Sequence, residues 1–277
     1  MNDAWRALLD GLEGLPALVA PDRLRERIEA LDRLDAPWPE HAEIEWLRRA
    51  SAMRARLEAA NTAQYAAIRE AIRRGHGREA LRRWWRGDGA LVHGDGYDWL
   101  DELVGGVLSF AAPAETVALA PEMVFYQPTP ARHILAMLDR LALDAADVLV
   151  DLGAGLGHVP LLAAACTGAH GIGVEIEPAH VASARRCAGE LRLENVRFVP
   201  CDAREADLSL GTVFYLYTPF GGAILRSVLD ALRREAGRRR FRVCSFGPCT
   251  ELLAREPWLA CDGAPARDRI AIFHSRG

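Results

Sequence analysis

Hydrophobic residues follow two different spacings along the chain, and the spacing changes at about residue 120. In the first part they recur every three or four positions, as on one face of an amphipathic helix. This spacing predicts helices at 5–12, 24–34, 40–74, 78–85 and 100–110. We therefore expect residues 1–120 to form an all-helical N-terminal domain that serves as a cap and substrate domain.

After residue 120, short apolar runs alternate with helical segments. The runs predict strands at 148–150, 171–174, 196–199, 212–217 and 241–246. Strands that alternate with helices are typical of an α/β fold with a parallel sheet. We expect this second domain to span residues 121–277.

A glycine-rich turn joins the first predicted strand to the helix that follows it, in the order Asp151-x-Gly153-x-Gly155-x-Gly157. Glycines permit positive φ and let a backbone approach a ligand closely. Glu175 ends the neighbouring strand, where a carboxylate can accept hydrogen bonds from ribose hydroxyls. The glycine spacing is tighter than the dinucleotide pattern G-x-G-x-x-G. It therefore predicts a nucleoside cofactor, and leaves a nicotinamide oxidoreductase as a weaker alternative.

This order of acids and glycines resembles motif I of the class I S-adenosylmethionine (AdoMet) methyltransferases. The resemblance implies a Rossmann-like, seven-stranded sheet that is completed by an antiparallel pair at 258–261 and 269–274. It implies that the glycine loop faces the methionine part of AdoMet and that Asp151 helps to hold its amino group. Cys201-Asp202-Ala203 follows the third strand, where the family places an acid near adenine. The cofactor-binding residues implied or expected in this part of the chain are Asp151, Gly153, Gly155, Gly157, Glu175, Asp202, Ala203 and Thr218.

The segment before this unit, Met123-Val124-Phe125-Tyr126-Gln127-Pro128-Thr129-Pro130, resembles the corresponding loop of the non-SET protein-lysine methyltransferases. That resemblance implies that Tyr126 and Thr129 contact AdoMet. A simpler reading is that Thr129 only caps the helix at 131–141, with Pro130 at its first position.

The methyl acceptor is less well defined by the sequence. After the fourth strand, Tyr217-Thr218-Pro219-Phe220 stands where base or glutamine N-methyltransferases often have Asp/Asn-Pro-Pro-Tyr/Phe, which disfavours those acceptors. Asp95, in a glycine-hinged turn, either caps the helix at 100–110 or reaches over the site with His93 or Tyr97. The candidate catalytic residues are Tyr126, Tyr217, His93 and Asp95.

We interpret the protein as an AdoMet-dependent methyltransferase with an N or O acceptor. The acceptor is either a small molecule, possibly aromatic or heterocyclic, or a protein side chain. The alternative is a non-catalytic AdoMet-binding or partner-binding module. A fixed catalytic motif is not required, because AdoMet supplies an activated carbon and the protein mainly aligns the acceptor.

Composition limits the possible partners. The net charge is −4, which gives no general attraction for nucleic acid or anionic membranes, so we expect neither as a partner. All 34 basic residues are arginine. Several of them lie in the window 73–86 together with Trp84 and Trp85, and this window is either a solvated face or a binding site for a partner. The six cysteines form no Cys-x-x-Cys pair, so we expect no metal. Without a signal peptide or an apolar span, a cytoplasmic location is expected, and the oligomeric state stays open.

Overall fold

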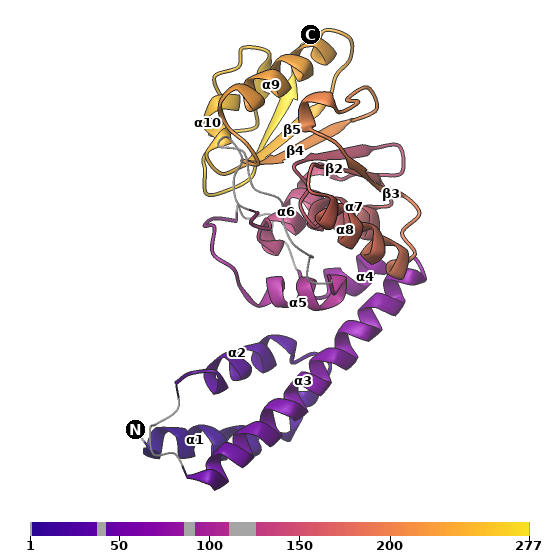
Figure 1. Cartoon of the computed structure of the whole chain (residues 1–277). Helices are drawn as coiled ribbons and strands as arrows, with labels where there is room; N and C mark the ends of the chain where they lie inside the picture. Colours follow the sequence, from indigo (N-terminus) through magenta and orange to yellow (C-terminus); the bar gives the residue numbers. More distant parts are fainter. Residues whose placement is uncertain (1, 38–42, 86–91, 111–125, 277) are drawn as a thin grey trace. The chain divides into compact units, whose positions relative to one another are not determined.

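The computed structural model describes residues 2–37, 43–85, 92–110 and 126–276. Residues 1–69 with 98–107 form one compact unit, and residues 70–97 with 108–277 form a second. The chain therefore passes between the units at three positions (Figure 1). Our division of the chain at residue 120 remains a proposal.

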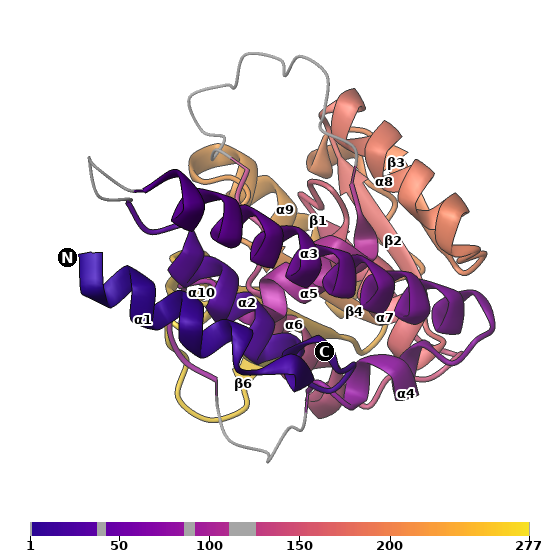
Figure 2. The ribbon, with the colours of Figure 1, turned by 90° about the horizontal axis from the view of Figure 1, so that it is seen from below.

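Amphipathic helices build the first unit. They are α1 (Asn2–Glu13), η1 (Pro16–Val19), α2 (Leu24–Leu34), and most of α3 (Ile44–Arg73) and α5 (Trp99–Leu108) (Figure 2). Their apolar faces meet in a core that contains Trp5, Leu9, Leu12, Leu18, Ala30, Leu34, Ala50, Met53 and Leu57. Gly106 of α5 lies against the Tyr65 ring, where a Cβ atom would come within 2.2 Å of a ring carbon.

A seven-stranded sheet forms the centre of the second unit, with the strand order β3-β2-β1-β4-β5-β7-β6. The strands are β1 (Val148–Leu152), β2 (His170–Glu175), β3 (Val196–Pro200), β4 (Val213–Tyr217), β5 (Arg242–Phe246), β6 (Leu259–Cys261) and β7 (Ala271–Ser275). The first five run parallel, and β7 pairs antiparallel with both β5 and β6. The predicted seven-stranded α/β fold with an antiparallel pair at its end is confirmed.

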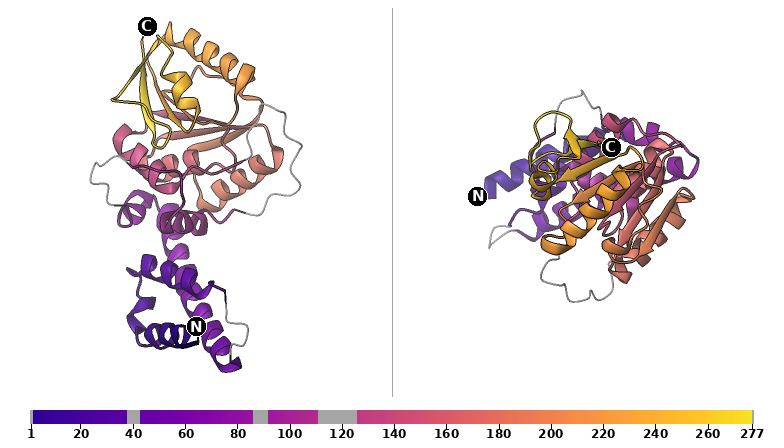
Figure 3. Two further views of the ribbon diagram at one scale, coloured as in Figure 1. Left: turned by 90° about the vertical axis from the view of Figure 1, so that its left-hand side faces the viewer. Right: turned by 90° about the horizontal axis from the view of Figure 1, so that it is seen from above.

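Helices cover both faces of this sheet (Figures 1 and 3). On one face, α9 (Gly222–Ala236) packs its apolar side onto strand residues such as Val150, Phe214 and Val243. On the other, α6 (Ala131–Leu141) packs against α7 (His158–Thr167), which contacts β1 and β2, and α8 (Pro178–Leu191) contacts β2 and β3. The short helices α4 (Gly77–Arg82), η2 (Ala203–Glu205) and α10 (Cys249–Leu253) complete the unit.

Two predicted helix caps were wrong. Asp98, and not Asp95, caps α5, because the Asp98 carboxylate accepts a hydrogen bond from Leu100 N at 2.8 Å. Thr129 makes no cap for α6, where Pro130 occupies the N-cap position. The Thr129 hydroxyl is instead hydrogen-bonded to the Tyr215 hydroxyl at 2.7 Å. Both Asp95 and Thr129 are thus available for another role.

Arg27 is the largest fully buried side chain of the helical unit. Its guanidinium donates to the Asn61 side chain at 2.7 Å and to the carbonyl groups of Leu18 and Ala20. Burial lowers the pKa of Arg27. The guanidinium therefore joins α2 to α3 and to the turn after η1.

We expect Arg27→Met to lower the free energy of unfolding by about 2–4 kcal/mol, because the buried Asn61 side chain and the carbonyl oxygens of Leu18 and Ala20 lose their donor. The matched change Arg25→Met, on the exposed side of α2, should cost less than about 0.5 kcal/mol. Urea unfolding followed by circular dichroism measures both values. Equal losses in the two variants would contradict the structural role of Arg27.

Candidate active site

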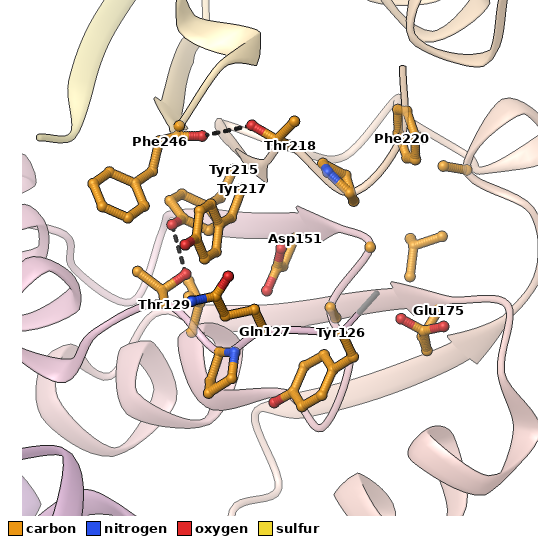
Figure 4. A pocket seen from close by; sticks show the side chains of 18 of the residues that line it. Tyr126, Gln127, Thr129, Asp151, Glu175, Tyr215, Tyr217, Thr218, Phe220 and Phe246 are labelled. Atoms are coloured by element: carbon orange, nitrogen blue, oxygen red, sulfur yellow. Dashed lines mark hydrogen bonds between the residues drawn. The ribbon is translucent and has the colours of Figure 1, made fainter. Parts of the chain in front are cut away.

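A pocket of about 1370 Å³ opens at the carboxyl ends of β1, β2, β4 and β5 (Figure 4). It lies where the chain order of the strands reverses between β1 and β4, which is the usual ligand site of open α/β sheets. The volume exceeds the roughly 300–1,000 Å³ of common small-molecule pockets. There is consequently room for two ligands side by side.

The glycine loop forms the floor of this pocket. Gly153, Gly155 and Gly157 have φ values of +89°, +53° and +86°, which side chains rarely permit. Space is equally restrictive: a Cβ atom on Gly153 would come within 2.2 Å of Pro219, and one on Gly155 within 2.0 Å of the Tyr126 ring. Gly153 lines the pocket directly, whereas Gly155 and Gly157 support its floor.

Two buried carboxyl groups flank this loop. Asp151 is 4% exposed, and burial together with the nearby Glu175 raises its pKa well above the ordinary value. The Glu175 carboxylate accepts hydrogen bonds from Gly155 N at 2.7 Å and from Glu177 N at 2.8 Å. Both carboxyl groups face the pocket, so a cationic or hydroxyl-rich ligand would find its partners here.

Asp202 and Ala203 line the pocket beyond β3. The Asp202 carboxylate caps η2 through Arg204 N and also pairs with the Arg204 guanidinium at 2.7 Å. The hydrogen bond from Arg204 keeps the pKa of Asp202 below its usual value. This part of the pocket therefore carries a fixed carboxylate.

Tyr126 lies over the glycine loop (Figure 4). Its hydroxyl is 3.1 Å from His158 Nδ1, and its ring stacks obliquely on His180. Burial lowers the pKa of His158 to about 4, so His158 is neutral at physiological pH and can accept the tyrosine proton in a hydrogen bond. His158 thus fixes the position of the Tyr126 ring.

The ends of β4 and β5 form the aromatic side of the pocket. The rings of Tyr217 and Phe246 lie 4.7 Å apart between centroids. Thr218 has a φ of +36°, and its hydroxyl donates to the Phe246 carbonyl at 3.1 Å and accepts from Cys249 N. This strained residue turns the chain at the pocket and ties β4 to β5.

Asp95 lines the pocket at its rim, close enough to Tyr217 for its charge to help burial raise the pKa of that tyrosine. His93 is an exposed residue outside the lining, and its Nδ1 lies 3.1 Å from the carboxylate of Asp268, which does line the pocket. Of the four candidate catalytic residues, Tyr126, Tyr217 and Asp95 thus share one pocket with the candidate cofactor residues.

Several pocket residues were not predicted from the sequence. They are His158, His180, Tyr215, Phe246 and Asp268. His158 directly follows the glycine loop, so its position at the start of a helix was a usable hint. The other four residues are brought to the pocket by the folding of the sheet and its loops, which the spacing in the sequence does not reveal.

No cluster of side chains suited to a metal ion occurs among the described residues. Within the same residues, no helix has the length and apolar character needed to cross a membrane. Residues 123–125 of the predicted cofactor loop lie outside the described part of the chain.

Comparison with protein families shows that residues 123–198 match the model of "Histone methylation protein DOT1". This range contains Tyr126, Thr129, the glycine loop and Glu175. No curated protein matches the chain. The match therefore covers the glycine loop and the part of the pocket next to it.

Solved structures of methyltransferases are similar to this chain. An RNA methyltransferase from Salinibacter ruber, in complex with S-adenosyl-L-homocysteine, is 29% identical over 54% of this chain and 92% of its own, with a TM-score of 0.43. Precorrin-6y C5,15-methyltransferase from Geobacter metallireducens is 20% identical over 58% and 94%, with a TM-score of 0.42. Geranyl diphosphate C-methyltransferase from Streptomyces coelicolor is 24% identical over 40% and 42%, with a TM-score of 0.35.

The names of these proteins give different acceptors. The comparisons do not support our expectation against a nucleic-acid acceptor. The strand order, the glycine loop between two carboxyl groups and the matched family model nevertheless agree on the reaction type. Residues 123–198 thus resemble a family of AdoMet-dependent methyltransferases, and the protein is an AdoMet-dependent methyltransferase with AdoMet as its cofactor.

Proposed function

We propose that this enzyme methylates an amino nitrogen and that the acceptor is the side chain of a protein lysine. The observation that carries the proposal is the composition of the pocket, where the exposed carboxylates of Asp95 and Asp268 line the same cavity as the Tyr217 ring. Carboxylates and aromatic faces both attract an ammonium group. The family match over residues 123–198 and the resemblance of the Tyr126 loop to lysine methyltransferases support the same acceptor.

On the cofactor side, we propose that Asp151 binds the amino group of AdoMet, Glu175 its ribose hydroxyls, and Asp202 with Ala203 its adenine. The chemistry of these groups fits the ligand. Asp151 is buried beside Glu175, so a positive charge placed there would relieve both desolvation and repulsion. Glu175 has its two oxygens oriented by backbone N–H groups but keeps lone pairs for hydroxyl donors.

The remaining candidates would surround the methionine part. The Tyr126 ring, held by His158, covers the glycine loop, and Thr129 and Thr218 stand on either side of Tyr215 and Phe246. Burial raises the pKa values of Tyr126 and Tyr217, so both hydroxyls stay protonated. We propose that they exclude water and orient the acceptor nitrogen rather than act as phenolate bases.

AdoMet supplies a methyl carbon that is activated for in-line displacement. A lysine ammonium has no lone pair, so it must release a proton before its nitrogen can attack. The rim at Asp95 is exposed, which lets this proton reach solvent. The protein's contribution is then alignment of the neutral amine in a pocket with few waters.

A second candidate acceptor is a small molecule that carries an aromatic ring and an aliphatic amine, which is protonated at neutral pH as lysine is. The pocket volume of about 1370 Å³ favours it, because a whole second ligand would fit beside the cofactor. The acidic rim would bind this amine in the same manner.

Labelled AdoMet distinguishes these acceptors. We expect label to enter total cell protein, to disappear when the lysine amines are acetylated beforehand, and to be recovered as methyl-lysine after hydrolysis. The enzyme contains no lysine, so it adds no lysine signal of its own. Label in purified RNA, or in protein regardless of acetylation, would overturn the proposal, and label only in a small amine would favour the second candidate.

For the cofactor loop, we expect Gly155→Val to abolish AdoMet binding. Its Cβ would overlap the Tyr126 ring, and valine disfavours a φ of +53°. Gly189→Ala in α8 is the matched control, because a Cβ atom there meets no neighbour within 4 Å. Calorimetric titration with AdoMet measures both; wild-type affinity in Gly155→Val would show that the cofactor binds elsewhere.

We further expect AdoMet affinity to fall on acidification at a higher pH than an exposed aspartate would cause. The pKa of Asp151 is raised, so its carboxylate, which would pair with the ammonium of AdoMet, is lost earlier as pH decreases. Asp151→Asn should weaken binding about 10- to 100-fold, corresponding to about 1.5–3 kcal/mol, and remove this pH dependence. 5′-Methylthioadenosine lacks the amino group, so its affinity should be unaffected. An equal loss for both ligands would assign Asp151 a different role.

A further inference from the structure

The segment from His93 to Tyr97, here called the strap, is fastened to the methyltransferase unit along its length. His93 pairs with Asp268, and the Gly94 carbonyl accepts from Arg132 at 2.8 Å and from His133 Nε2 at 2.6 Å. The Gly96 carbonyl also accepts from Arg132, and the Tyr97 hydroxyl donates to the Pro128 carbonyl at 2.9 Å. These contacts hold the backbone on both sides of Asp95.

Asp95 differs from its neighbours in the strap. Asp95 lines the pocket, and no hydrogen bond or ion pair joins its side chain to another described residue. It lies near Tyr217 and Tyr97, since its charge and the Tyr97 hydroxyl both act on the pKa of Tyr217. A fixed backbone therefore holds a carboxylate with free acceptor oxygens beside the aromatic side of the pocket.

The other charges at this rim have partners. Asp268 pairs with His93, and Arg267 pairs with Glu251 at 2.5 Å. The loop that bears Arg267 and Asp268 is attached to the end of β5 by the hydrogen bond from Gly247 N to the Arg267 carbonyl. Asp95 is thus the carboxylate at the described rim that is left for a ligand.

We propose that Asp95 is the specificity-determining residue that recognises the positive charge of the methyl acceptor, and that the strap positions it. This inference rests on the proposed function, because only a cationic acceptor needs such a carboxylate. As the acceptor enters, its ammonium donates a charge-assisted hydrogen bond to Asp95 beside Tyr217. The ammonium then releases a proton to solvent at this exposed rim, and the neutral nitrogen attacks the methyl carbon. Asp95 acts in acceptor binding, and methyl transfer itself depends on the alignment at the glycine loop.

The test uses the full-length enzyme with Nα-acetyl-lysine amide as acceptor, and acetyl-norleucine amide as its uncharged analogue. Asp95→Asn should raise the KM for the lysine probe about tenfold with little change in kcat. With S-adenosyl-L-homocysteine present, calorimetry should show the same loss of lysine-probe binding. The affinities for AdoMet and for the norleucine analogue should not change.

Two further variants distinguish a direct contact between Asp95 and the acceptor from a general electrostatic attraction by the negative charges of the rim. Asp268→Asn removes a carboxylate of the same rim that already has a partner, and should raise the KM less than Asp95→Asn. Asp262→Asn removes an exposed carboxylate that pairs with His274 outside the pocket, and should have no effect. Equal effects of Asp95→Asn and Asp268→Asn, or an effect on kcat alone, would overturn the role of Asp95.

Different outcomes would contradict the role of Asp95 and the proposed amine acceptor. If wild-type enzyme methylates the lysine probe and Asp95→Asn does so with the same KM, the role of Asp95 is wrong and the amine acceptor stands. If wild-type enzyme neither binds nor methylates the probe, and label enters only RNA or hydroxyl groups, both proposals fall.

Discussion

The site depends on one contact, the hydrogen bond from Gly155 N to the Glu175 carboxylate. It joins the loop after β1 to the end of β2, although 20 residues separate the two groups. The same carboxylate accepts from Glu177 N and so fixes the start of the chain segment that leads into α8. The position of Glu175 thereby sets the shape of the glycine loop, and the loop in turn sets where Tyr126 and Pro219 can lie.

Negative charge is concentrated in this pocket, and this arrangement is electrostatically unfavourable in the absence of a ligand. Asp151 and Glu175 are both buried and repel each other, which raises the pKa of Asp151. A folded protein keeps such an arrangement when a ligand supplies the compensating charge. The sulfonium and amino groups of AdoMet are cations, so the proposed binding of AdoMet beside Asp151 and Glu175 would offset the repulsion between the two carboxyl groups.

The sheet and the position of the glycine loop at its edge were predictable because their signals are local. The alternation of apolar runs with helices predicted the strands, and the order of Asp151, the glycines and Glu175 predicted their common edge. The two wrong caps have different causes. Asp98 directly precedes α5 and accepts from Leu100 N, the ordinary spacing of an N-cap, so the local pattern favoured Asp98 over Asp95. The partner of Thr129 is Tyr215, which is 86 residues away, so no spacing rule could reveal it.

The division of the chain into units determines whether the helical unit can be removed or exchanged as a module. The helical unit takes residues from before and after the strap, so residues 70–97 of the second unit lie in sequence between its two parts. A truncation at any single position up to residue 107 would remove part of one unit or interrupt the other. The helical unit therefore cannot be exchanged by dividing the chain at a single position, because removing all residues through α5 also removes Asp95.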